Sequence, residues 1–72
     1  MSTTERAAYV FRVSEYADGT PWISLEPRNG GLNICKGGML GFDLPEGTGF
    51  RQAQEIARYL QQHLGDLGYT SP

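Results

Sequence analysis

The chain has 72 residues and a formal net charge of −2, and 39% of its residues are hydrophobic against 19% that are charged. That length allows one domain, and the composition is too apolar for a chain that stays disordered. The six Lys and Arg residues are spread along the sequence, so they form no basic block that would neutralise a row of nucleic-acid phosphates.

A single cysteine excludes a disulfide within the chain. One cysteine and one histidine also cannot build a closed zinc site, which takes four nitrogen or sulfur ligands. The longest apolar runs are far shorter than the ~20 residues that cross a bilayer, and the polar N-terminus lacks the apolar segment of a signal peptide. We therefore expect a cytoplasmic protein with a reduced thiol and no membrane partner.

Both ends of the sequence are small and polar, so we expect residues 1–6 to form a disordered N-terminal tail and residues 68–72 a flexible C-terminal tail. Residues 7–67 then form a single α+β domain. Its first strand is predicted over residues 7–16, which are rich in aromatic and β-branched types. One set of side chains is expected to face inward and the alternating set outward: Tyr9, Phe11 and Val13 against Val10, Arg12 and Ser14.

The Asp-Gly pair at residues 18–19 is a strong turn signal, because glycine adopts positive φ without a Cβ clash. Residues 22–26 follow as the second predicted strand. In this strand Ile23 and Leu25 share one face, and Trp22 lies on the other.

The glycine-rich residues 28–42 come next. We expect a third short strand over residues 32–36 and another extended segment over residues 39–44, in which apolar residues again alternate. The Gly-Gly pair at residues 37–38 is either a tight hairpin turn or a bulge that bends one longer strand.

Residues 48–64 carry the clearest pattern, an apolar stripe at spacings of three and four that predicts an amphipathic helix. The stripe consists of Phe50, Ala53, Ile56, Ala57, Leu60 and Leu64. Thr48 is placed to accept from the first free N–H groups as N-cap, and Gly65 is placed to end the helix in the left-handed conformation.

These elements predict an α+β fold with two layers. A three- or four-stranded antiparallel sheet, in the order β-β-β-(β)-α, carries the single C-terminal helix packed on one face. A 17-residue helix at ~1.5 Å per residue and a seven-residue strand at ~3.3 Å per residue have similar lengths, so the helix can lie along the sheet.

The glycine-rich stretch does not match a phosphate-binding loop. Cys35 stands where a glycine should precede Lys36, and Gly37 stands where a hydroxyl residue should follow it. An apolar alternation comes next in place of a helix, so no helix N-terminus is available for an anion. We interpret these glycines as turn and bulge residues.

Two pairs of residues are of types that occur in catalytic sites. Cys35 and His63 are of the types that make a nucleophile and its base, but no third group is evident to orient them. Asp43 and Glu46 flank Leu-Pro and resemble paired carboxylates, yet acid–base work needs a pocket that shifts their pKa values. We therefore predict no catalytic residues, no cofactor-binding residues and no metal ligands.

One helix cannot cover both faces of a sheet, so the face opposite it is expected to be open. The alternation places an indole and its neighbours there, and we predict that this face is an interaction surface. Its predicted residues are Val10, Arg12, Trp22, Ser24, Glu26 and Met39.

Residues 42–48, just ahead of the predicted helix, are similar to the strand-to-helix turn of HicB-type antitoxin domains. The order of strands followed by a C-terminal helix also resembles these domains and other double-stranded-RNA-binding-like modules. The sequence departs from their Pro-Gly turn signature, so no functional residue is carried across. The resemblance implies a nucleic-acid-binding or antitoxin-like regulatory domain.

Because the open face is predicted to be self-complementary, we expect a non-enzymatic protein-interaction module that forms a homodimer through it. Binding to another protein is a further expectation. Two alternatives stay open. One is nucleic-acid binding, with Arg12, Trp22 and Lys36 as a stacking and phosphate-binding surface. The other is a small enzyme that uses Cys35 or the two carboxylates.

Overall fold

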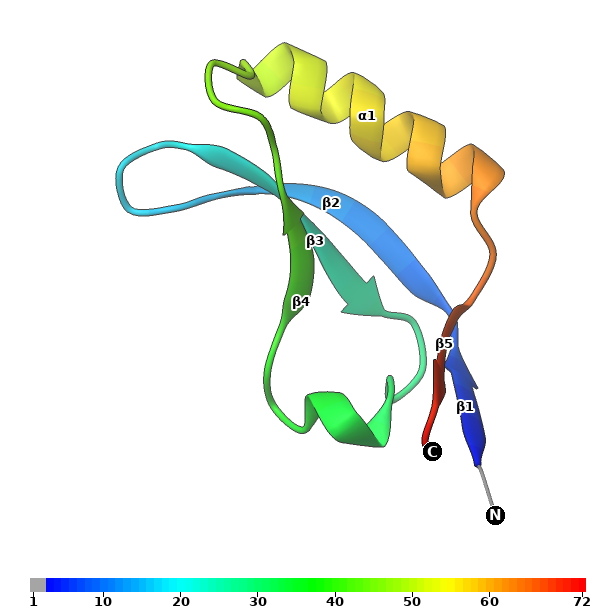
Figure 1. Ribbon diagram of the computed structural model, residues 1–72. Coiled ribbons are helices and arrows are strands. Elements are labelled where there is room, and N and C mark those ends of the chain that lie inside the picture. The colour runs from blue at the N-terminus through cyan, green and yellow to red at the C-terminus, as the bar shows by residue number, and fades with distance from the viewer. Residues whose placement is uncertain (1–2) are drawn as a thin grey trace.

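A computed structural model describes residues 3–72 as two antiparallel sheets and one long helix (Figure 1). The elements are β1 (Thr4–Ala7), β2 (Tyr9–Glu15), β3 (Pro21–Pro27), the short 3₁₀ helix η1 (Asn33–Cys35), β4 (Leu40–Asp43), α1 (Phe50–His63) and β5 (Leu67–Thr70). Strands β2, β3 and β4 form one sheet in that order, and β1 pairs with β5 in a second. The α+β class is confirmed.

The hairpin of β2 and β3 follows the predicted pattern closely. The two strands pair along their full length, from Tyr9 opposite Pro27 to Glu15 opposite Pro21. Gly19 has a φ of 86° in the connecting loop, as the turn requires. The predicted first strand is divided, because residue 8 belongs to neither β1 nor β2.

The third predicted strand, over residues 32–36, is wrong. Residues 33–35 form η1 instead, and the chain then leads through a turn into β4. The side chain of Leu32 is buried and its backbone N–H donates to Tyr9 Oη at 3.0 Å, which draws the chain inward. Gly31 and Gly37 flank the segment at φ of 74° and 72°, so the chain turns there rather than extending. Residues 37–38 are therefore neither a hairpin turn between two strands nor a bulge.

Helix α1 starts two residues later than predicted. Gly49 is its N-cap, and Gln52 Oε1 accepts from the Gly49 N–H at 3.0 Å, whereas Thr48 Oγ1 donates to the carbonyl of Pro45. Gly65 is not among the positive-φ glycines, so the expected left-handed stop is wrong; Leu64 is the C-cap, with φ −108° and ψ 145°.

We expected unstructured tails over residues 1–6 and 68–72; residues 1 and 2 lie outside the described part of the chain, and the described terminal segments form strands instead. Thr4–Ala7 and Leu67–Thr70 pair as antiparallel strands, with Thr4 opposite Thr70 and Ala7 opposite Leu67. Beyond the last pair, the N–H of Ser71 donates to the carbonyl of Thr3 at 2.8 Å. The two ends of the described chain therefore lie side by side (Figure 1).

The core has two parts. Ile23, Ala53 and Ala57 form the one beneath the helix, with Phe11, Val13, Leu44, Ile56 and Leu60 packed around them. Ala7, Tyr9, Leu25 and Leu32 form the other, near the β1–β5 pair. Helix α1 packs mainly on β2 and β3. The helix side of β4 is thus left largely open, and this decides where the exposed apolar surface lies.

Candidate interaction surfaces

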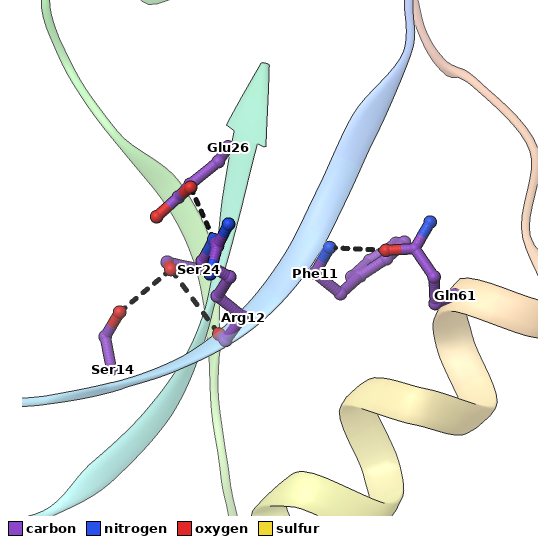
Figure 2. Close-up of polar contacts among 6 residues, drawn as sticks. All are labelled: Phe11, Arg12, Ser14, Ser24, Glu26 and Gln61. Carbon is purple, nitrogen blue, oxygen red and sulfur yellow. Dashed lines mark hydrogen bonds and ion pairs between the residues drawn. The ribbon is translucent and has the colours of Figure 1, made fainter. Parts of the chain in front are cut away.

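The sheet face opposite α1 brings together most of the surface residues predicted from the sequence. Val10, Arg12, Trp22, Ser24 and Glu26 share it, and Met39 precedes β4 with 63% of its surface exposed. Their polar groups mainly contact one another (Figure 2). Arg12 Nε pairs with Glu26 Oε2 at 2.6 Å, and the fully buried Ser24 hydroxyl lies 2.9 Å from that of Ser14.

Trp22 lies among neighbours from its own chain. Its indole stacks on Tyr16 with ring centroids 5.3 Å apart and an angle of 14° between the planes. The indole also covers Gly41, where an added Cβ would lie 2.3 Å from Trp22 Cζ3. The Tyr16 hydroxyl donates to Asp43 Oδ1 at 2.6 Å, and this bond raises the pKa of Tyr16. Sequence reasoning missed Tyr16 and Gly41.

A second surface lies on the helix side of the sheet, where sequence reasoning did not place it. Leu40, Phe42 and Leu64 leave 42%, 51% and 51% of their surfaces exposed there, and we call these three residues the β4 apolar surface. A cavity of about 140 Å³ adjoins it. The cavity is lined by Tyr9, Phe11, Leu25, Phe42, Leu64, Gly65, Asp66 and Leu67. The alternation in residues 39–44 was visible in the sequence, but which strands the helix covers was not.

A third feature is a groove of about 500 Å³ between β2 and α1, which we call the β2 groove. It is lined by Val10, Phe11, Arg12, Val13, Phe50, Gln54, Ala57, Arg58 and Gln61. Gln61 reaches from the helix to the strand, where Oε1 accepts from the Phe11 N–H at 2.8 Å (Figure 2). Its Nε2 also donates to the Tyr9 carbonyl at 3.5 Å.

The residues considered for catalysis lie in separate surroundings. Cys35 is half-buried against the second core, and the Tyr9 hydroxyl lies 4.0 Å from its Sγ. The imidazole of His63 contacts the ring of Tyr59, with centroids 4.3 Å apart. Asp43 accepts the Tyr16 hydroxyl, and Glu46 lies in the loop that precedes α1. Between residues 3 and 72, no hydrogen bond joins Cys35 to His63 and no cluster of three potential metal ligands occurs.

No protein-family model, no curated protein and no solved structure matches this chain. Within the described part of the chain, no helix is both long enough and apolar enough to cross a bilayer. The resemblance to HicB-type domains therefore rests only on residues 42–48 and on the strands that precede α1, since β5 follows the helix.

Proposed function

We propose that the protein is a non-enzymatic interaction module that forms a two-fold homodimer through the β4 apolar surface. The observation that supports this most is the half-exposed Phe42 beside Leu40 on an edge strand. A cytoplasmic location is part of the proposal, and the single free thiol of Cys35 is in keeping with it.

The free edge of β4 follows from the hydrogen-bonding pattern of the sheet. Arg28 N–H donates to the Ala8 carbonyl, so the even-numbered residues form the hydrogen-bonded pairs of the β2–β3 hairpin. The backbone N–H and C=O groups of the odd-numbered residues of β3 therefore point toward β4, where Ile23 is opposite Phe42 and Leu25 is opposite Leu40. The N–H and C=O groups of Gly41 consequently point away from β3, toward the open edge.

A second β4 strand fits this edge in an antiparallel, two-fold arrangement centred on Gly41. Gly41 of each copy would exchange both backbone hydrogen bonds with Gly41 of the other. Leu40 would then lie opposite Phe42 of the second copy, and Phe42 opposite Leu40, in non-hydrogen-bonded pairs whose side chains approach closely. The apolar surface of one copy would thus cover that of the other, with no further protein required.

The size of the surface predicts a weak dimer. Three half-exposed side chains leave on the order of 300 Å² of apolar surface per copy. Two such surfaces with a short strand pair fall below the ~1,200 Å² of a typical stable interface. The face that carries Trp22 stays a predicted alternative, although its charged and hydroxyl groups already have partners within the chain.

Sedimentation equilibrium over a micromolar to millimolar concentration range tests the proposal. We expect wild type to dimerise with a Kd of roughly 100 µM and Phe42→Ser to weaken the dimer about tenfold or more. Tyr59→Ser is the matched control, because Tyr59 is also an exposed aromatic side chain, at 62%, but lies on α1 outside this surface. A wild type that stays monomeric at millimolar concentration contradicts the proposal. Weakening by Val10→Ser but not by Phe42→Ser would assign the contact to the Trp22 face instead.

A further inference from the structure

The outer edge of the N-terminal strands is occupied along part of its length. Ser71 N–H donates to the Thr3 carbonyl, so the backbone N–H and C=O groups of the odd-numbered residues of β1 point toward β5. The backbone groups of the even-numbered residues of β2 point toward β3, so those of the odd-numbered residues of β2 point to the outer edge. Along this edge β5 pairs with residues 4–7, and the Gln61 side chain forms hydrogen bonds with the Tyr9 carbonyl and the Phe11 N–H. Val13 follows next, and within residues 3–72 no strand lies beside β2 there.

The Gln61 amide occupies the position of a peptide group from a neighbouring strand. It accepts from Phe11 N–H and donates to Tyr9 C=O, the two groups that a single residue of an adjacent parallel strand would bind. The β2 groove continues along the edge from that point, past Val13 toward Phe50. Backbone groups of an extended segment therefore have a place to bind beyond Gln61.

The side chains of the groove favour an acidic occupant with apolar residues. Among the described residues its lining contains two arginines, Arg12 and Arg58, and no Asp or Glu. Arg12 already pairs with Glu26, whereas Arg58 makes no ion pair with any residue in the described range 3–72. Phe50 is 47% exposed and offers an apolar contact at one wall of the groove.

We propose that the β2 groove binds an extended, acidic segment of a partner protein by strand addition. The segment pairs with the outer edge of β2 at Val13, as in other cases where a peptide extends a sheet. A carboxylate of the segment meets Arg58, and an apolar side chain packs against Phe50. This site is at the opposite edge of the sheet from β4, so it is open in both the monomer and the proposed dimer.

The probes are two blocked, fluorescently labelled peptides of six residues, one alternating Val and Glu and the other alternating Val and Lys. Fluorescence anisotropy at low salt should show saturable binding of the Glu peptide, with a Kd of roughly 1 mM or tighter. The Lys peptide should bind about tenfold more weakly or not at all. Equal binding of the two peptides, or no binding of either at ~10 mM, overturns the proposal.

Two variants locate the contact. Arg58→Gln should weaken binding of the Glu peptide about threefold to fivefold, the effect of one partly exposed ion pair. Arg51→Gln, which changes an exposed arginine of α1 outside the groove, should leave it unchanged. In ¹⁵N-labelled protein the largest peptide-induced shifts should fall on the amides of Val13 and Glu15, and slower hydrogen exchange at Val13 should accompany them. Shifts confined to other elements, or equal effects of the two arginine variants, contradict strand addition here.

Discussion

Gly41 explains why Trp22 lies within its own chain rather than free on the sheet surface. A glycine on an edge strand leaves a gap in the row of side chains, and the indole from the neighbouring strand fills that gap. Tyr16 then stacks on the indole from the end of the hairpin. The stacked pair of Tyr16 and Trp22 therefore requires a residue without a side chain at position 41.

Gly41→Ala is expected to destabilise the fold by about 1–3 kcal/mol, the usual range for overpacking a filled site. The added Cβ would lie 2.3 Å from Trp22 Cζ3 and 2.4 Å from the Ile23 carbonyl oxygen. The carbonyl belongs to the backbone of the central strand, so a rotamer change of the indole cannot relieve the clash. Urea denaturation followed by circular dichroism measures the cost. Gly65→Ala is the control, since a Cβ there meets nothing within 4 Å and φ is not positive; equal stability losses in the two variants would contradict this account.

The hydrogen bond from Tyr16 to Asp43 predicts a change in titration. The hydrogen bond from the Tyr16 hydroxyl to the Asp43 carboxylate is the main cause that raises the pKa of Tyr16 above 10.0, followed by desolvation and by the charge of Asp43. A raised folded-state pKa means that this contribution to stability is fully present below pH 10.0 and is lost as the pH rises through the folded-state pKa. Asp43→Ala should therefore lower the pKa of Tyr16, measured from its ring ¹³C shift against pH. Glu46→Ala removes a carboxylate from the next loop and should leave that titration curve in place.

At the scale of elements, the sequence pattern predicted the helices and strands that depend on neighbouring residues. The apolar stripe of α1 and the alternation of β2 and β3 are properties of neighbouring residues, and these elements formed close to the predicted bounds. Residues 32–36 carry the residue types of a strand, but the burial of Leu32 and the hydrogen bond to Tyr9 override that preference. The pairing of β1 with β5 depends on residues 60 or more positions apart, which no local pattern contains.

The candidate surfaces divide in the same way. The sequence placed Val10, Arg12, Trp22, Ser24 and Glu26 on one face of the sheet, because side chains alternate along a strand. It did not contain the position of α1 across the sheet, which is set by how Ala53 and Ala57 fit against Ile23. The exposure of Leu40 and Phe42 follows from that position alone, so the β4 apolar surface became visible only in three dimensions.

Leu60 and Leu64 offer a matched test of how α1 packs. Leu60 is half-buried against the core beneath the helix, whereas 51% of Leu64 is exposed. Leu60→Ala should cost about 2 kcal/mol of unfolding free energy, toward the low end for a leucine that loses core contacts. Leu64→Ala should cost less than about 1 kcal/mol. Thermal melts at dilute, monomeric concentration compare the two; a larger loss for Leu64→Ala would mean that the helix packs in a different register.

At the scale of the whole molecule, the two ends of the described chain close the fold on itself. Beyond the strand ladder, Thr3 and Ser71 exchange backbone and side-chain hydrogen bonds, and the hydroxyls of Thr4 and Thr70 lie 2.9 Å apart. Leu67 packs against the core of Ala7, Tyr9, Leu25 and Leu32. A domain of this length has little core to spare, so this terminal pair adds apolar contact that the helix and the main sheet alone lack.

A disulfide between positions 4 and 70 tests whether the terminal strands pair in solution. Because Ser71 N–H donates to the Thr3 carbonyl, Thr4 and Thr70 form a non-hydrogen-bonded pair, whose Cα atoms approach to about 4.5 Å, within the range that a disulfide spans. The two residues are 66 positions apart, so the cross-link closes most of the chain into one loop. Loop-closure entropy sets an upper limit of about 4 kcal/mol on the gain in unfolding free energy. We expect Thr4→Cys/Thr70→Cys, made with Cys35→Ser to prevent mispairing, to oxidise in air as a monomer and to unfold at higher urea than the same protein after reduction. Frayed ends would instead give slow or intermolecular oxidation with no gain over the reduced form, and residues 3–6 and 68–72 would then be disordered, as their composition suggests.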